Sequence, residues 1–367
     1  MKNYIKTTFF SFITVGILLP LLFSGCNKDG VGIYYSISKE EKQINSKISE
    51  LPVHQVVEVG TKVYALTGRS IWEKEQSGSS WNDIGNGYDI VAYEGGADPD
   101  ALYAFFNKDD SSLEKGILKE LDIDNSVWSE IEGSDFDDKG KLIDIGDNTY
   151  ALRVGKSTDP QLYLINDLST NPLDAANKVA DDDAFAAIDG TFLDSSHYII
   201  SDTDIYSCSE GSLTDISVLT FSPTGDTEKS GDFAAITNDG TNLYTITSSG
   251  QVFRSTDGSS WDYIDSVSEN PSESSAAVFT DSTDTKYLLI GTNDGYFELN
   301  LSETEASVVG PTETASTSDP QSFEAAYPDL AQSMVFDIWV SSADDVFYLA
   351  TENGLWQRTS SEDFRRQ

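Results

Sequence analysis

Apolar residues in most of this chain occur in short runs rich in β-branched and aromatic side chains, separated by clusters of Gly, Asn, Asp and Ser. Residues 232–267 show the pattern clearly. Four runs, "DFAAIT", "NLYTITS", "QVFRSTD" and "WDYIDSV", are joined by the turns "NDGT", "SG" and "GSS". Short apolar runs bounded by turn-forming residues are typical of β-strands in hairpins. This segment therefore predicts a four-stranded antiparallel meander.

The same unit recurs along the chain, and a tyrosine leads its second strand each time. The tyrosines are Tyr64, Tyr103, Tyr150, Tyr198, Tyr244, Tyr287 and Tyr348. Their spacing runs from 39 to 61 residues. Repeats of this length with four short strands are typical of β-propellers. We therefore expect an all-β, seven-bladed β-propeller of four-stranded antiparallel blades, with eight blades as the alternative.

The first strand of each repeat should line the central axis of the propeller. The seven candidates lie at 56–60, 89–93, 141–146, 185–189, 233–237, 275–279 and 335–340. The last repeat stops after "GLWQRT" with no clear fourth strand, whereas 32–38 and 44–50 read as strands without a repeat of their own. These observations predict that an N-terminal strand completes the last blade and closes the ring.

The first residues read as an export signal. Two lysines precede an apolar stretch, 7–23, that ends in "LLFSGC". It is short for a membrane-spanning helix. The ending resembles the lipobox of bacterial lipoproteins, although Phe23 stands where that family prefers Leu. The resemblance implies a signal peptide at 1–25, a lipidated Cys26 that carries palmitate-type acyl chains, and a short tether at 26–31.

The lipobox resemblance also implies a location in the bacterial cell envelope. Asn27 stands where Asp would signal retention in the inner membrane of enteric bacteria, so the outer membrane is favoured. Either face of that membrane remains open. The only other cysteine, Cys208, has no disulfide partner within the chain and is expected to be a buried small apolar residue.

The net charge of −39 argues against nucleic acid as a partner. A surface so acidic has no basic patch to displace the counterions of nucleic acid, so no nucleic-acid partner is expected. Membrane lipid through Cys26 and an envelope protein or a glycan are the expected partners. No cofactor or metal site is assigned; acidic turns at 122–128, 135–138, 181–183 and 202–204 leave weak Ca²⁺ binding as an alternative.

The stretch "STDGSSW" at 255–261 resembles the Asp-box of sialidase-like propellers, and "GSSW" at 78–81 is a reduced copy. The resemblance implies a structural hairpin at the rim rather than a catalytic centre. Asp257 is expected to accept hydrogen bonds from turn amides after Ser255, Gly258 to take a positive φ, and Trp261 to wedge into the blade. Trp81 and Trp128 are expected to act in the same way.

No catalytic residue is assigned. A sialidase would need clustered arginines, whereas Arg69, Arg153 and Arg254 fall at different places in their repeats. His54 and His197, the only histidines, are too few for a multi-histidine metal site. A glycosidase pair of carboxylates could lie among the many acidic residues, but no spacing identifies it.

An inserted loop at 310–334 interrupts the repeat rhythm inside the propeller domain, 32–367. Loops of this length are often functional. Phe323, Tyr327 and Leu330 would line one side of a short helix and form the candidate partner contact. We therefore expect a membrane-anchored envelope lipoprotein that acts as a non-catalytic binding or assembly platform. The alternative is a carbohydrate-active, sialidase- or glycosidase-like enzyme or a glycan-binding protein that uses the central funnel.

Overall fold

In the computed structural model, one folded unit extends from Lys47 to the C-terminus. The residues described are 48, 51–93, 100–109, 112–136, 140–156, 159–166, 168–169, 172–180, 185–225, 227–267, 275–293, 295–302, 308–309, 330, 333–341, 346–359 and 364–367. The expected signal peptide at 1–25, the tether at 26–31 and the strand at 32–38 lie outside these residues. No helix in the described part of the chain has the length and hydrophobicity to span a membrane.

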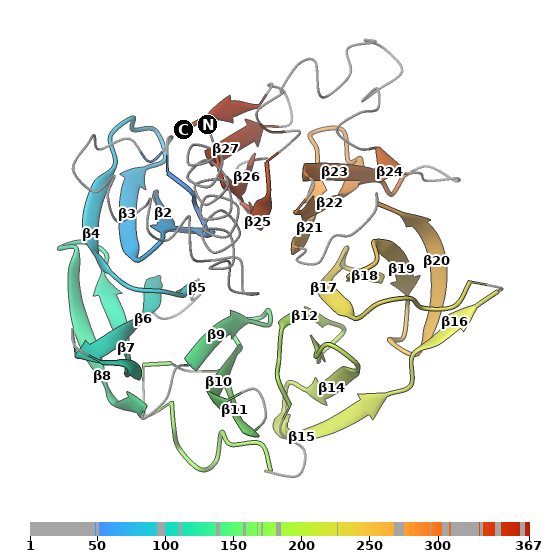
Figure 1. Ribbon diagram of the computed structural model, residues 1–367, viewed down its shortest axis with the longest axis horizontal. Coiled ribbons are helices and arrows are strands. Elements are labelled where there is room, and N and C mark those ends of the chain that lie inside the picture. Colours follow the sequence, from blue (N-terminus) through green and yellow to red (C-terminus); the bar gives the residue numbers. More distant parts are fainter. Residues whose placement is uncertain are drawn as a thin grey trace, which may run out of the picture. The chain divides into compact units, whose positions relative to one another are not determined.

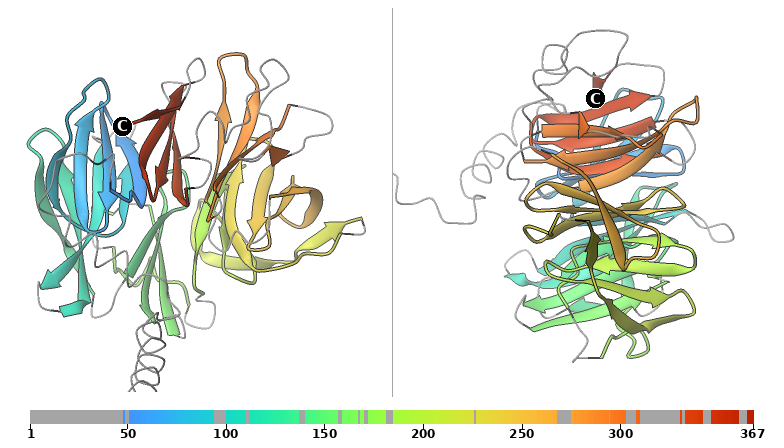
Figure 2. Two further views of the ribbon diagram at one scale, coloured as in Figure 1. Left: turned by 45° about the horizontal axis from the view of Figure 1, so that its top comes forward. Right: turned by 90° about the vertical axis from the view of Figure 1, so that its right-hand side faces the viewer.

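The described residues form a ring of seven β-sheet blades, which confirms the seven-bladed propeller and excludes the eight-bladed alternative (Figure 1; Figure 2). In every blade, consecutive strands pair antiparallel from the axis outward. The innermost strands contact one another in sequence around the axis, and the last contacts the first. The ring is therefore closed by packing between inner strands.

The first three blades occupy the N-terminal part of the unit. Blade 1 contains β1 (Gln55–Val59), β2 (Lys62–Thr67), β3 (Ser70–Glu75) and β4 (Asn82–Asn86). Blade 2 contains β5 (Ile90–Tyr93), β6 (Ala101–Asp109), β7 (Ser112–Asp122) and β8 (Val127–Phe136). Blade 3 contains β9 (Gly140–Asp144), β10 (Tyr150–Lys156) and β11 (Asp159–Ile165).

The remaining four blades complete the ring. Blade 4 contains β12 (Asp189–Leu193), β13 (Ser196–Ile200), β14 (Ile205–Ser209) and β15 (Ser212–Leu219). Blade 5 contains β17 (Phe233–Asn238), β18 (Leu243–Thr247), β19 (Gln251–Ser255) and β20 (Ser260–Ser266), with β16 (Ser222–Thr224) added. Blade 6 contains β21 (Ser275–Thr280), β22 (Lys286–Thr292), β23 (Gly295–Asn300) and β24 (Val308–Val309). Blade 7 contains β25 (Val335–Val340), β26 (Val346–Thr351), β27 (Gly354–Thr359) and β28 (Arg365–Arg366).

Two blades depart from the four-stranded pattern. In blade 3, a single bridge between Tyr163 and Lys178 takes the place of a regular fourth strand. In blade 5, β16 arrives directly from blade 4 and pairs parallel with the outer strand β20, with Pro223 opposite Trp261. The outer edge of blade 5 is thereby covered by chain from its neighbour.

The apolar core is divided among the interfaces between blades. Each of the seven neighbouring pairs of blades encloses one hydrophobic cluster. The repeated tyrosines all lie in the second strands, as the repeat predicted. Tyr150 shows one reason for the residue type. Its buried ring packs between blades 2 and 3, and its hydroxyl donates a 2.7 Å hydrogen bond to Ala92 O in the neighbouring blade.

The inner strand of blade 4 begins later in the chain than the sequence pattern predicted. The run at 185–189 predicted the strand, but β12 begins only at Asp189. The two-residue loop Asp194–Ser195, with both φ values positive at 51° and 64°, sets the register of the β12–β13 hairpin. The carbonyl groups of Ala187 and Ile188 instead accept side-chain hydrogen bonds from blade 3.

The last blade also differs from the prediction. Its fourth strand is β28, close to the C-terminus, which pairs antiparallel with β27. The expectation that an N-terminal strand fills this place is therefore wrong. The two-residue length of β28 explains the error, because no strand pattern can be read from so few residues. The described N-terminal residues Ile48 and Val53 pack instead between blades 7 and 1, where Val53 N donates to Thr351 O at 2.9 Å.

The inserted loop at 310–334 lies mostly outside the described residues, as do Phe323 and Tyr327. Leu330 is described and is fully buried in the cluster between blades 6 and 7. A side chain without accessible surface cannot contact a partner, so Leu330 does not form the expected partner contact. Its apolar character serves the interface between the two blades.

Candidate functional site

The Asp-box turn connects the two outer strands of blade 5. The hydroxyl of Ser255 accepts hydrogen bonds from the backbone N–H groups of Asp257 and Gly258 at 3.2 and 2.9 Å. Oδ1 of Asp257 accepts the N–H groups of residues 259 and 260, both at 2.8 Å. These bonds stabilise the ionised carboxylate and lower the pKa of Asp257. The turn satisfies its own polar groups.

Trp261 secures the same turn to the neighbouring blade. Its indole N–H donates to Gly258 O at 3.0 Å, and its ring is fully buried. The ring stacks on Phe221 with centroids 5.4 Å apart, in the cluster between blades 4 and 5. Gly258 has a φ of 73°, and a Cβ there would lie 2.7 Å from the Tyr198 ring. The motif is thus packed against protein on the side of its glycine and tryptophan.

The other two tryptophans of the repeat lie at corresponding places. Trp128 in blade 2 donates to Ile84 O of blade 1 at 2.9 Å. Trp81 in blade 1 is buried in the cluster shared with blade 7, and the Lys74 ammonium lies 5.4 Å from its ring centroid. In all three blades the tryptophan contacts the preceding blade. We conclude that the tryptophan recurs because it joins blades.

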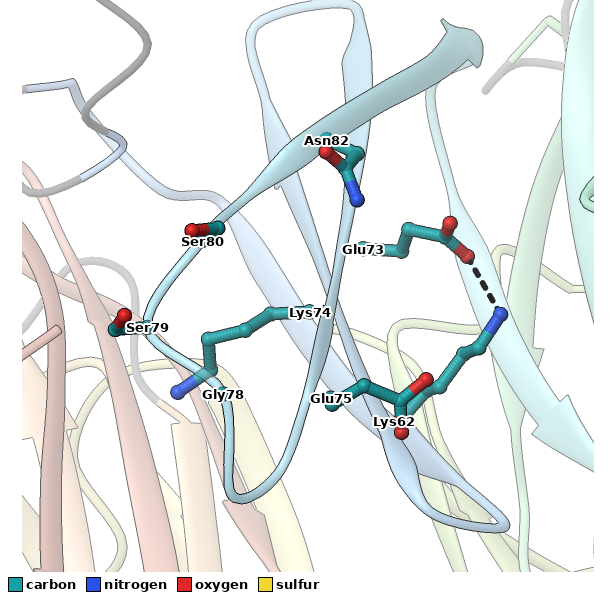
Figure 3. A pocket seen from close by; sticks show the side chains of 8 residues that line it. All are labelled: Lys62, Glu73, Lys74, Glu75, Gly78, Ser79, Ser80 and Asn82. Carbon is teal, nitrogen blue, oxygen red and sulfur yellow. Dashed lines mark hydrogen bonds and ion pairs between the residues drawn. The ribbon is translucent and has the colours of Figure 1, made fainter.

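A polar pocket of about 260 Å³ lies beside the reduced "GSSW" copy in blade 1 (Figure 3). Glu73 accepts hydrogen bonds from Lys62 Nζ at 3.1 Å and from the Ser126 hydroxyl. Lys74 points away from this pair and donates to Gln367 Oε1 at 2.8 Å. The charged groups of the pocket thus have partners within the protein. The lining residues are Lys62, Glu73, Lys74, Glu75, Gly78, Ser79, Ser80 and Asn82.

A different polar group surrounds the axis at the end of the ring where the inner strands begin, which we call the leading end. Three half-buried aspartates here accept the backbone N–H of the inner strand of the next blade. The bonds are Leu142 N to Asp89 Oδ2 at 3.3 Å, Ile236 N to Asp189 Oδ2 at 2.9 Å and Val56 N to Asp337 Oδ2 at 3.0 Å. These axial carboxylates connect blades 2 to 3, 4 to 5 and 7 to 1.

Gln55 makes the equivalent connection between blades 1 and 2, because its Oε1 accepts the N–H of Ile90 at 3.0 Å. Asp189 and Asp337 each use both oxygens. Their Oδ1 atoms accept the N–H of Gly190 at 2.8 Å and of Ile338 at 2.9 Å. Side chains that accept backbone N–H groups across blade boundaries hold the ring together at its centre.

The surroundings shift the acidity of the axial carboxylates. Burial raises the pKa of Asp89 to about 7, and the charges of Lys141 and Arg153 oppose this rise. Burial likewise raises the pKa of Asp189 and of Asp337 to about 6. The charge of Lys141 lowers the pKa of all three carboxylates. We call Lys141 and Arg153 the axial cations.

The axial cations occupy facing positions on adjacent strands of blade 3, Lys141 on β9 and Arg153 on β10. Lys141 Nζ donates to Ile188 O at 3.2 Å, and Arg153 Nη1 donates to Ala187 O at 3.4 Å. Both acceptors belong to the segment that leads into blade 4. Blade 3 is thereby connected to blade 4 by cations, whereas blades 2, 4 and 7 are each connected to the next blade by a carboxylate.

The residues considered for catalysis do not come together. Arg254 lies on β19 of blade 5, half-exposed, 3.8 Å from Asp262. Arg69 lies in the β2–β3 turn of blade 1, so only Arg153 of the three arginines joins the axial group. His197 is buried, with Nδ1 3.3 Å from a backbone carbonyl oxygen. Cys208 is buried as expected, and burial raises the pKa of its thiol to about 11.

The acidic turns considered for Ca²⁺ binding are those at 122–128, 135–138, 181–183 and 202–204. Asp122 accepts hydrogen bonds from the N–H groups of Asp124 and Asn125 within its own turn. Residues 181–183 and part of 135–138 lie outside the described residues. Nowhere in the described part of the chain do three His, Cys, Asp or Glu side chains come close enough to hold a metal ion.

The sequence-based list of site residues missed the axial carboxylates and Lys141. A signal was present, because Asp89, Asp189 and Asp337 all fall within the runs predicted as inner strands. A charged residue in a strand that faces a crowded axis is unusual and marks a position with a specific partner. Which partner it has depends on the neighbouring blade and cannot be read from the strand itself.

No protein-family model matches this chain, and neither does any curated protein. Solved structures do match. PorZ, an essential bacterial surface component of the type-IX secretion system of Porphyromonas gingivalis, is 12% identical with a TM-score of 0.54, over 88% of this chain and 39% of PorZ. The extracellular domain of a candidate hybrid two-component system from B. thetaiotaomicron is also 12% identical, with a TM-score of 0.55, over 83% of this chain and 38% of that one.

This chain thus spans about two fifths of the length of either structure. At such identity the likeness shows the fold alone. It shows that this chain and the matching regions of these two structures share the β-propeller fold.

Proposed function

We propose that this protein is a lipid-anchored propeller of the bacterial cell envelope that acts as a non-catalytic binding platform. The proposal rests on the side-chain hydrogen bonds that join neighbouring blades at the axis. Four neighbouring pairs of blades are joined at the axis by an Asp or Gln side chain that accepts a backbone N–H of the next blade. A ring held in this way keeps its loops in fixed positions, and a fixed surface binds with little loss of conformational entropy.

The anchor in this proposal is Cys26. The lipobox-like "LLFSGC" ending and the surface and extracellular settings of the similar structures both support it. Acyl chains contribute roughly 0.8 kcal/mol per buried CH₂, so several chains together hold a protein stably at a membrane. Asn27 favours the outer membrane. The partner in this proposal is an envelope protein or a glycan presented there.

Crosslinking in intact cells tests the platform, with Cys26→Ser as the matched variant. We expect the native protein in the membrane fraction with a reproducible crosslinked partner. We expect Cys26→Ser to be lost from the membrane fraction and to lose that partner, because both depend on the anchor. Recovery of no reproducible partner from the native protein, together with retention on a glycan array, would overturn the platform in favour of a glycan-binding protein.

The carbohydrate-active alternative is favoured by one observation, the convergence of Asp89, Asp189 and Asp337 at the leading end. Carboxylates in a funnel can act as general acids and bases. However, Asp189 and Asp337 use both of their oxygens on backbone N–H groups. A carboxylate held in this way is poorly placed to exchange protons with a substrate, so the non-catalytic platform is the better supported function.

A further inference from the structure

The axial cations have more hydrogen-bond donors than acceptors. An ammonium group has three N–H donors and a guanidinium group has five. Lys141 uses one donor on Ile188 O, and Arg153 uses one on Ala187 O. No carboxylate among the described residues lies within ion-pair distance of either side chain. Both side chains are half-buried, and their unused donors are not among the fully buried polar atoms, so a ligand can reach them.

The nearby carboxylates do not satisfy these donors. Both oxygens of Asp189 accept backbone N–H groups, and so do both oxygens of Asp337. The charge of Lys141 acts on them from a distance and lowers their pKa values without a direct contact. Accessible cations whose donors are not all used within the protein can bind an anion through charge-assisted hydrogen bonds.

The type of anion follows from the geometry and the charges. Arg153 presents a planar fork that matches the two oxygens of a carboxylate, and Lys141 adds a point charge beside it. Three axial carboxylates outnumber the two axial cations, so the net local charge is negative when all of these groups are ionised, and the second negative charge of a dianion such as phosphate is unfavourable. A monoanion with two oxygens in one plane therefore fits best.

We propose that Lys141 and Arg153 bind the carboxylate group of a small acidic ligand at the leading end of the axis. The site deepens the proposed platform function by naming a class of ligand, and it rests on that function. The ligand is a monocarboxylate, either the acid group of a sugar acid or that of a simple organic acid. Carbonyl groups at 187 and 188 hold the two cations in place for it.

Calorimetric titration of the full-length protein in detergent tests the site. The probes are D-glucuronate, D-glucose, acetate and inorganic phosphate. We expect glucuronate to bind and glucose, which has the same ring without the acid, not to bind. Binding of acetate as strong as that of glucuronate supports recognition of the carboxylate alone. Binding of glucuronate only supports a sugar acid. Phosphate bound more tightly than either carboxylate would overturn the proposal.

Variants assign the binding to the axial cations. Arg153→Met and Lys141→Met are each expected to weaken glucuronate binding at least about tenfold, because each removes charge-assisted hydrogen bonds. The matched control is Arg254→Met, which removes a cation from blade 5 and is expected to bind as the parent does. Thermal unfolding checks that each variant folds, and Arg153→Lys retains the charge if Arg153→Met does not fold.

Two results would contradict the site. One is the absence of binding for both carboxylates to the folded parent protein. The other is unchanged affinity in folded variants of Lys141 and Arg153. Neither result bears on the platform, whose test is the crosslinked partner in cells. The two proposals therefore fail separately.

Discussion

The Asp-box turn of blade 5 and the axial cations of blade 3 are both polar sites in an acidic protein, but they differ in how far their hydrogen bonds are satisfied. In the turn, Asp257 Oδ1 accepts two N–H groups and the Trp261 indole N–H reaches Gly258 O. At the axis, Lys141 and Arg153 each donate a single bond. We therefore assign the turn a structural role and propose a ligand only for the axial cations.

The positions of the two sites in the ring reinforce this difference. The third strand of a blade runs in the same direction as the first, so the Asp-box turn after β19 lies at the end opposite to the leading end. The Asp-box turn, which the sequence identifies most clearly, therefore lies far from the charged side chains at the axis. Three predictions test this division, from the largest expected effect to the smallest.

Trp261→Ala should give the largest loss of stability. The side chain is fully buried between blades 4 and 5, and its removal leaves a cavity that the rigid ring cannot close. Removal of a buried aromatic ring typically costs about 3–5 kcal/mol. Urea unfolding measures the change. Val218→Ala is the control, since Val218 is 63% exposed in blade 4 and should cost little. Equal losses in the two variants would mean that Trp261 does not join the blades.

Gly258→Ala should be the next most destabilising. It combines the strain of a positive φ with a clash against Tyr198 and Leu219. Gly240 separates the two effects, because it also has a positive φ, 82°, but no atom lies within 4 Å of an added Cβ. We expect Gly240→Ala to cost about 1 kcal/mol. Gly258→Ala should cost about 1–3 kcal/mol more, by overpacking. The same urea unfolding measures both, and a smaller loss at 258 than at 240 would refute the packing of this turn.

The pH dependence of stability should give the smallest effect. Burial raises the pKa of Asp89 from the ordinary value of 3.8 to about 7, so the folded state binds this proton more tightly than the unfolded state. The free energy of unfolding should therefore fall as the pH rises from about 4 to about 7, and the contribution of Asp89 should be constant above that range. Asp189 and Asp337 act in the same direction up to about pH 6.

Thermal unfolding between pH 4 and 8 measures this dependence. Asp89→Asn should flatten the profile, because the amide oxygen still accepts the N–H of Leu142 but cannot be ionised. Acidification also relieves general repulsion in a chain with a net charge of −39. Asp215→Asn on the exposed face of β15 reports that background and should retain the parent profile. Equal flattening in both variants would show that ionisation of Asp89 does not cause the pH dependence of stability.

Much of the fold could be predicted from local patterns. Runs of β-branched and aromatic residues between turn residues predict strands, because both preferences act within a few residues. Seven tyrosines at the same place in seven repeats predicted the number of blades correctly. The errors arose where a neighbour decided the outcome. β28 is too short to recognise, and the register of β12 is set by its hairpin with the neighbouring strand β13.

The candidate site was less predictable than the fold. Asp89, Asp189 and Asp337 lie about 100 to 250 residues apart, and the spacing of acidic residues does not distinguish them from exposed ones. Leu330 was expected at a partner contact from its helical spacing, yet it fills the interface between blades 6 and 7. Periodicity shows that a side chain needs an apolar contact, but it does not show which surface provides it.

The sequence by itself determined the strands, their grouping into seven repeats and the local chemistry of the Asp-box turn, because these depend on residues close together in the chain. Only the tertiary structure decided which blade closes the ring and which charged side chains meet at the axis. Ring closure brings the starts of the inner strands together. The partners of Asp337 and Lys141 are thus set by the packing of blades, over distances along the chain that no local pattern records.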